Sequence, residues 1–413
     1  MLDKYSAPLY NGFKRSNLSE GSAMSLARQL VLFENGAGMP LPSGYGPRRP
    51  GRFEVARIVL AKGSLDTPER ERFVRGICEV YTGVPVVERL AVAHNRIEVP
   101  GSESVERIKR GKRTLVVGEL SPKNAVWRYG PRSTVYDHEW CFSVYGFCPY
   151  NCAYCYLGAV PGIWYSPAVR IYVNLPEIVS AIDRQATAVG RPVTFYLGTL
   201  QDGLALDPLT AYSTVLIPFF AGHRYARCFI QTKSADVRRL LDLEHNGHTV
   251  VSWTLSPREI AERFETNAPR VGARLAAMEA CAAAGYPVCA NFIPVVPCGD
   301  WEAQYLELAR EVLDRVPLRR LALGGACMKH RAIELLEARK GKDNAISSHL
   351  AGRASSREGE QAFYSPGLCD RLFRQIAELA ERFAPCRAVF DAGHGGTLAL
   401  SFRRNDSYAL FPN

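Results

Sequence analysis

Three cysteines lie within eight residues in the stretch "GFCPYNCAYCYLG", at positions 148, 152 and 155. Thiolates bind both zinc and iron–sulfur clusters, but a structural zinc site uses four ligands. A [4Fe–4S] cluster has four iron atoms, so three cysteine ligands leave one iron open. The spacing of Cys148, Cys152 and Cys155 therefore predicts a cluster that keeps a coordination site for a cofactor.

Two other interpretations of these cysteines are a zinc knuckle and a set of redox-active thiols. A zinc knuckle needs a fourth ligand nearby, and no His or Cys follows Cys155 at that spacing. In a reducing compartment, clustered cysteines more often bind metal or act in catalysis than form disulfides. Several of the other cysteines stand singly among apolar residues and are expected to pack as small hydrophobes: Cys78, Cys228, Cys281, Cys289 and Cys386.

The elements around the cysteines alternate between strands and helices. The cysteines directly follow an apolar strand at residues 139–146. Alternation of continuous apolar strands with helices predicts a parallel sheet, so we expect an α/β fold with a partial (β/α)6 barrel. The chemistry of such a barrel gathers at the C-terminal ends of its strands. Further strands are predicted at 193–199, 226–233, 249–256, 287–296, 318–328 and 387–393, and helices at 175–189, 270–285 and 300–316.

Composition shifts along the chain suggest four segments. Residues 1–52 are rich in Gly, Pro, Ser and Arg and predict a flexible arm with one short helix at 22–33. Residues 53–115 read as strand, helix and strand, a small N-terminal α/β subdomain. Residues 116–335 form the predicted barrel. Residues 336–413 form a C-terminal extension with a closing helix and strand, in which the polar run 340–366 suggests an insertion or a lid.

The chain of 413 residues is 47% hydrophobic and carries a net charge of +10, with basic stretches at 45–53, 107–114 and 337–342. The charge suits nucleic acid, nucleotides or other anionic substrates, and equally an ordinary solvated surface. No run of 18 apolar residues and no secretory signal are present, so we expect a cytoplasmic protein without a membrane segment.

The spacing C-x3-C-x2-C, with an aromatic residue before the last cysteine, resembles the signature of radical S-adenosylmethionine (SAM) enzymes. The ordered motifs "KRTLVVG", "CAYCYL", "VRIYVNL", "LALDPLT" and "QTKS" resemble spore photoproduct lyase within that superfamily, over most of the chain. The resemblance implies a radical-SAM barrel in which SAM binds the open iron of a [4Fe–4S] cluster. One electron, from a reductant such as flavodoxin or ferredoxin, then cleaves SAM to a 5′-deoxyadenosyl radical that abstracts hydrogen from the substrate.

The resemblance also implies roles for particular residues. Cys148, Cys152 and Cys155 would ligate the cluster. Tyr154 and Tyr156 would lie beside SAM and the substrate. The remaining SAM-binding candidates follow the barrel strands, where each could equally be a capping or surface residue: Gly198, Gln201 and Asp202 for the amine, Lys233 for the carboxylate, and Thr254 and Ser256 for the ribose.

One position departs from the family pattern. Spore photoproduct lyase carries a cysteine that returns a hydrogen atom to the product radical, and Thr199 stands at that position here. The hydroxyl O–H bond is too strong to replace a thiol as the donor. Cys298 and Cys327 end the fifth and sixth barrel strands, and either could supply a thiol or simply pack. We take Cys298 as the candidate donor and Tyr156 as a second catalytic candidate.

Three functions are compatible with these patterns. The first is a DNA-repair lyase that acts on a thymine photoproduct through a relocated hydrogen donor. The second is a radical SAM enzyme that makes or breaks C–C or C–S bonds in the biosynthesis of modified nucleosides. Thr199 slightly favours the second function. The third, a nucleic-acid-binding protein with a structural cluster, fits poorly because structural metal sites have no open position.

Overall fold

The computed structural model describes residues 45–129, 139–351, 361–391, 396–404, 407 and 409–411. Most of the predicted arm, including the helix expected at 22–33, lies outside the described residues. Within the described ranges, no helix combines the length and the apolar character needed to cross a lipid bilayer.

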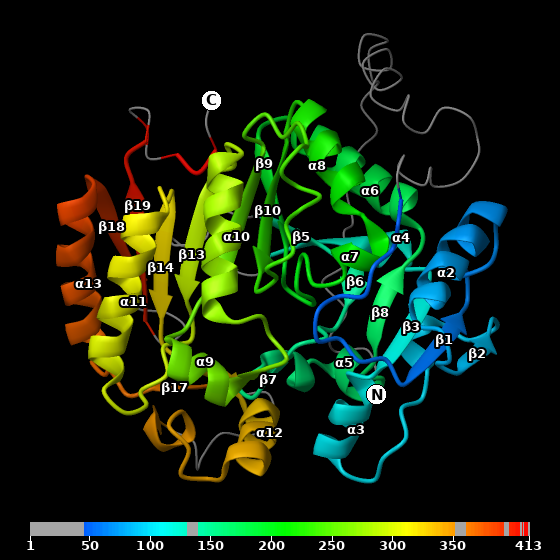
Figure 1. Ribbon diagram of the computed structural model, residues 1–413, viewed down its shortest axis with the longest axis horizontal. Coiled ribbons are helices and arrows are strands. Elements are labelled where there is room, and N and C mark those ends of the chain that lie inside the picture. Colours follow the sequence, from blue (N-terminus) through cyan, green and yellow to red (C-terminus); the bar gives the residue numbers. More distant parts are fainter. Residues whose placement is uncertain are drawn as a thin grey trace.

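A large sheet of nine strands forms the body of the molecule, in the order β18-β19-β14-β13-β11-β10-β9-β5-β4 (Figure 1). Its six central strands run parallel to one another, as predicted, and the partial (β/α)6 barrel is confirmed. The six strands are β5 (Trp140–Phe142), β9 (Val193–Leu197), β10 (Ala226–Thr232), β11 (Thr249–Thr254), β13 (Val288–Phe292) and β14 (Arg320–Gly324).

Amphipathic helices cover the sheet between these strands. Helix α6 (Leu175–Val189) buries residues at helical spacing, among them Leu175, Ile178 and Ile182, and ends at Gly190 in a left-handed conformation. This helix matches its predicted range of 175–189. The other connecting helices are α7 (Asp207–Thr210), α8 (Ser213–Gly222), α9 (Arg258–Phe264), α10 (Val271–Ala283) and α11 (Trp301–Arg315).

Three antiparallel strands extend the parallel core. At one end, β4 (Val126–Arg128) pairs with β5. At the other end, β19 (Thr397–Phe402) pairs with β14, and β18 (Cys386–Asp391) pairs with β19, while helix α13 (Asp370–Phe383) precedes them. The sequence reading anticipated β18 but missed β19, although its run "TLALSF" is apolar and buried.

A second, smaller sheet has the order β2-β1-β3-β8-β6 (Figure 1). Strands β2 and β1 come from the predicted N-terminal subdomain, β3 crosses its predicted boundary at residue 115, and β8 and β6 come from later residues. The small sheet and the barrel are therefore joined next to the cysteine loop. Its elements are β1 (Arg57–Ala61), β2 (Val86–Arg89), β3 (Thr114–Gly118), β6 (Tyr145–Gly146) and β8 (Val169–Tyr172), with helices α2 (Pro68–Val80), α3 (Ser104–Gly111) and α4 (Pro122–Ala125).

The polar run at 340–366 is only partly a loop. Helix α12 (His330–Lys340) leads into it, and its described residues include β16 (Leu350–Ala351) and β17 (Gln361–Tyr364). These two strands form a three-stranded sheet with β15 (Cys327–Lys329). Residues 352–360 lie outside the described part, so the expected lid stays a prediction.

Candidate cluster and cofactor site

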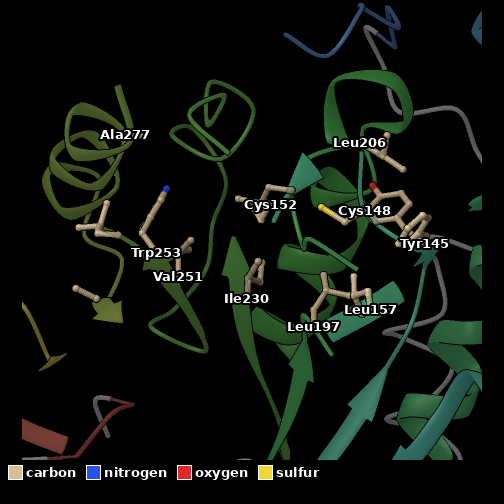
Figure 2. Packing of buried hydrophobic residues seen from close by; sticks show 14 of the residues in the cluster. Tyr145, Cys148, Cys152, Leu157, Leu197, Leu206, Ile230, Val251, Trp253 and Ala277 are labelled. Atoms are coloured by element: carbon tan, nitrogen blue, oxygen red, sulfur yellow. The ribbon is translucent and has the colours of Figure 1, made fainter. Parts of the chain in front are cut away.

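The three cysteines lie on one loop between the two sheets. Cys148 follows β6, and Cys152 ends the two-residue strand β7 (Asn151–Cys152). Cys148 and Cys152 belong to the main buried cluster of the molecule (Figure 2), whereas Cys155 is half-buried. β7 pairs with β12 (Glu265–Thr266), which follows the fourth parallel strand and helix α9. The loop is thus fixed to the C-terminal side of the barrel.

The donor set of this loop fits an anionic metal cluster. Cys148, Cys152 and Cys155 lie on one short loop, within electrostatic reach of one another. Burial raises the pKa of Cys152 to about 11, and the Lys233 ammonium opposes that rise. Burial likewise raises the pKa of Cys148, with Lys112 opposing it. Cations that face a set of thiols offset the charge that the thiolates acquire when they bind iron.

These side chains are less suited to coordinating a single metal ion. Among the residues that the structure describes, no three His, Cys, Asp or Glu side chains converge on one ion position. A four-iron cluster makes a different demand, because each thiolate binds its own iron atom. The three cysteines are therefore assigned to a cluster as a proposal, in line with the sequence prediction.

A buried ionic network lies against the cysteine loop, and its centre is Glu265. Arg274 Nη2 lies 2.6 Å from Glu265 Oε2, and Lys233 Nζ lies 4.0 Å from Glu265 Oε1. The Tyr154 hydroxyl donates to Glu265 Oε1, and Ser256 Oγ donates to the same oxygen at 3.2 Å. One carboxylate thus brings together three of the residues predicted to bind SAM.

The charges in this network support one another. Burial by itself would raise the pKa of Glu265, but Lys233 and Arg274 outweigh burial and hold that pKa below its ordinary value. Burial opposes the charge of Lys233, but the Cys152 thiolate and Glu265 outweigh it and raise the lysine pKa. Lys233 is therefore a cation at neutral pH, as binding to a carboxylate requires.

The turn after β9 is held by its own polar side chains. Asp202 accepts hydrogen bonds from Thr232 Oγ1 and from the backbone N–H groups of Leu204, Ala205 and Lys233. Gln201 bonds to the backbone of residues 142, 144 and 145 and to Ser143 Oγ. Both side chains are nearly saturated by these bonds, which gives them a role in positioning the turn.

Gly198, the first residue of this turn, has a steric role. A Cβ atom at Gly198 would lie 2.6 Å from the Cβ of Gln231 on the neighbouring strand. Only glycine allows the turn and β10 to approach this closely. The contact of this turn with the SAM amine stays a prediction. Because the side chains of the turn are already bonded, we expect its backbone carbonyl groups to make that contact.

A polar ladder crosses the ends of three adjacent strands. Gln231 Nε2 donates to Thr254 Oγ1 at 2.8 Å, and Asn291 Nδ2 donates to Gln231 Oε1 at 2.7 Å. Thr254 was predicted, but Gln231, Asn291, Glu265 and Arg274 were missed. The available signal was the position of Gln231 and Asn291 at the ends of two parallel strands, where barrels place their sites.

A thiol lies directly beside Thr199. β5 and β9 are parallel neighbours, and Cys141 Sγ lies 3.0 Å from Thr199 Oγ1. The hydroxyl of Tyr156, a side chain that is 47% exposed, donates to the backbone carbonyl of Thr199. Burial raises the pKa of Cys141 to about 12, so the group is a protonated thiol at neutral pH. The structure thus brings Cys141, Thr199 and Tyr156 together.

The two cysteines proposed from the sequence lie elsewhere. Cys298 is buried in the loop between β13 and α11, where Arg263 Nη1 lies 2.7 Å from its sulfur. Cys327 begins β15, and burial raises its pKa to about 11. Cys141, by contrast, contacts Thr199 directly, so the geometry favours Cys141 over both as the donor.

We expect Glu265→Gln to lower the free energy of unfolding by about 3–5 kcal/mol, because it leaves the charge of Arg274 buried and uncompensated. Urea denaturation followed by circular dichroism measures this loss. The matched control is Glu279→Gln, since Glu279 pairs with Arg315 at a partly exposed position worth about 0–1 kcal/mol. Equal losses in the two variants would contradict the central role of Glu265.

The same network predicts a pH dependence. The pKa of Glu265 is depressed in the folded chain, so its contribution to stability is present above the ordinary glutamate pKa of about 4.3. That contribution is lost as the pH falls below this value, towards the depressed pKa. The difference in stability between wild type and Glu265→Gln should therefore shrink in acid, which the same denaturation measured at several pH values tests.

Lys233→Ala is expected to weaken SAM binding by about 1.5–3 kcal/mol, because the family resemblance assigns this lysine a charge-assisted contact to the SAM carboxylate. Anaerobic titration calorimetry on the iron-loaded protein measures the affinity. Lys123, an exposed lysine on α4, provides a control variant that should bind SAM normally. An unchanged affinity in Lys233→Ala would remove this lysine from the site.

The comparisons with known proteins agree with this geometry. The model of the family described as spore photoproduct lyase matches residues 64–339. The spore photoproduct lyase of Geobacillus sp. (strain Y412MC61) is 30% identical over 244 residues, which cover 57% of this chain and 67% of that protein. The spore photoproduct lyase of Clostridium acetobutylicum is 24% identical over 261 residues, covering 63% of this chain and 74% of that protein.

Solved structures share the fold. A spore photoproduct lyase complexed with dinucleoside spore photoproduct superimposes with a TM-score of 0.70 at 24% identity, covering 82% of this chain and 98% of that one. A mutant lyase with bound AdoMet and dinucleoside spore photoproduct also gives 0.70, at 23% identity and the same coverage.

Proposed function

Because this chain belongs to the spore photoproduct lyase family, and is thus a radical SAM enzyme with a [4Fe–4S] cluster, we propose that it cleaves a cross-linked pyrimidine dinucleoside in DNA. The observation that carries the proposal is the Cys141 thiol, 3.0 Å from the position where the family has its hydrogen-donor cysteine. The solved spore photoproduct lyases that bind dinucleoside spore photoproduct support a dinucleoside substrate.

The chain's own residues have distinct tasks in this proposal. Cys148, Cys152 and Cys155 hold the cluster, and Lys233 binds the SAM carboxylate from the network centred on Glu265. Thr254 and Ser256 would contact the ribose, and Tyr154, which bonds to Glu265, would contact SAM. When bound, the cluster and SAM together supply a carbon-centred radical that abstracts a hydrogen atom from the substrate.

The remaining steps balance with one thiol. Loss of a hydrogen atom from the photoproduct weakens the C–C cross-link, which breaks homolytically and leaves one base intact and the other as a carbon radical. The Cys141 S–H bond breaks, and its hydrogen atom forms the missing C–H bond. One electron from the external reductant and one proton from water return the sulfur radical to the thiol.

A second candidate is the modification of a free nucleoside or nucleotide, which Thr199 favours. That argument rested on the lack of a thiol at the donor position. The contact between Cys141 and Thr199 weakens it, because a thiol lies next to the same position on the adjacent strand. The lyase is therefore the first candidate.

A product assay separates the two candidates. The iron-loaded chain is incubated anaerobically with SAM, dithionite and either synthetic dinucleoside spore photoproduct or free pyrimidine nucleosides. We expect the dinucleoside to be converted to two molecules of thymidine, detected by mass spectrometry. Formation of 5′-deoxyadenosine with consumption of a free nucleoside, while the dinucleoside stays intact, would overturn the proposal.

A further inference from the structure

One lysine of the basic stretch 107–114 is buried. Lys109, Arg110 and Arg113 are exposed, as a surface that attracts anions would require. Lys112, by contrast, is only 6% exposed and stands directly after helix α3. The basic stretch therefore contains one buried lysine, and the proposed function gives that lysine no role.

Lys112 binds the loop that carries the cysteines. Its Nζ atom donates a hydrogen bond of 2.9 Å to the carbonyl oxygen of Cys148 and one of 2.5 Å to that of Tyr150. The same nitrogen lies 4.1 Å from the centre of the Phe147 ring, a cation–π contact. Lys112 thus contacts three residues of a four-residue segment around the first cysteine.

The conformation that Lys112 secures is an uncommon one. Phe147 has a φ angle of +62°, which costs a bulky residue about 1–3 kcal/mol and persists only where surrounding contacts impose it. A hydrogen bond from its N–H group to the carbonyl of Leu200, at 2.9 Å, is a second restraint. The chain turns here, immediately before Cys148, so this backbone conformation decides where the first thiol lies.

Close packing at the end of helix α3 allows Lys112 to reach the cysteine loop. A Cβ atom at Gly111 would lie 1.4 Å from the carbonyl oxygen of Pro167, so only glycine lets the end of the helix pack against that segment. This close packing brings Lys112 from the small sheet to the cysteine loop.

The charge of Lys112 also needs a counterpart, because an isolated buried ammonium is costly. No ion pair joins Lys112 to a carboxylate within the described ranges, whereas Cys148 lies within its electrostatic reach. The thiolate that Cys148 would contribute to a bound cluster would supply the negative charge facing this lysine.

We propose that Lys112 is a positioning residue for the iron–sulfur cluster: it fixes the loop before Cys148 and places a positive charge beside the first cluster ligand. The inference rests on the proposed ligand set and is independent of the substrate. Because a nearby cation favours the cluster state with one more electron, Lys112 also raises the reduction potential of the cluster.

Lys112→Met tests this inference by readouts other than catalysis. We expect the iron-loaded variant to lose iron to a chelator about tenfold faster than wild type, the lower end of the effect of outer-shell substitutions on metal affinity. Its cluster should also have a more negative reduction potential in a titration followed by electron paramagnetic resonance. Lys109→Met, an exposed change on the same helix, should behave as wild type in both measurements.

The possible results test the cluster ligands and the role of Lys112 separately. Wild-type chain that binds no cluster would refute the ligand set itself. Wild-type iron retention and potential in a folded Lys112→Met variant would refute the role of Lys112 alone. If the methionine variant does not fold, the reduction potential of the cluster is measured in Lys112→Gln instead. Glutamine keeps an N–H donor but lacks the charge. An unchanged potential in that variant would likewise refute the role.

Discussion

Alanine at Cys148, Cys152 and Cys155 together is expected to reduce the iron content from about four atoms per chain to none and to abolish 5′-deoxyadenosine formation. Each thiolate binds one iron atom, and the three lie on a single loop fixed between β6 and β12. Iron and sulfide analysis after anaerobic reconstitution, followed by detection of 5′-deoxyadenosine with dithionite and SAM, measures both effects.

The control for this experiment is Cys281→Ala. Cys281 is fully buried in helix α10, so the substitution tests whether loss of any buried cysteine disturbs the fold enough to prevent cluster binding. This variant should retain its iron. If the triple-alanine protein still cleaves SAM reductively, the assignment of the cluster to these cysteines is wrong.

The ligand spacing and the barrel could be predicted from the sequence because both are local patterns. Three cysteines in eight residues and apolar strands that alternate with helices need no knowledge of long-range contacts. Helix α6 was placed correctly for the same reason, since its apolar spacing and terminal glycine lie within one segment.

The supporting residues could not be predicted because their partners are distant in the sequence. Lys112 precedes Cys148 by 36 residues, and Glu265 follows Tyr154 by 111 residues. A buried glutamate between polar neighbours has no local pattern that distinguishes it from a surface residue. Its role appears only when β12 pairs with β7 and brings it beneath the cysteine loop.

Cys141 was overlooked as the donor for a related reason. It lies in an apolar strand ahead of the cluster motif, where a cysteine is typical of core packing. Only the parallel pairing of β5 with β9 places its sulfur beside Thr199. The position that lacks a thiol in the sequence thus has a thiol as its neighbour in space, which is why we propose Cys141 as the donor.

Cys141→Ala is accordingly expected to leave SAM cleavage intact and to abolish formation of the repaired thymidine product, because the product radical lacks a hydrogen donor. By-products of that radical should replace the normal product in mass spectra. In D2O the exchangeable thiol should deliver deuterium into the wild-type product and none in the variant. Burial keeps this group protonated at neutral pH, which a hydrogen-atom donor requires.

Cys298→Ala is the matched comparison, since it removes the thiol that the sequence alone favoured. Cys298 contacts Arg263 in the loop after β13, whereas Thr199 contacts Cys141. We therefore expect normal product and normal deuterium incorporation from the Cys298→Ala variant. The reverse result, with normal product from Cys141→Ala and by-products from Cys298→Ala, would restore the original candidate. Normal product from both variants, without solvent deuterium in the wild-type product, would mean that the product radical takes its hydrogen atom from a non-exchangeable C–H bond and not from a thiol.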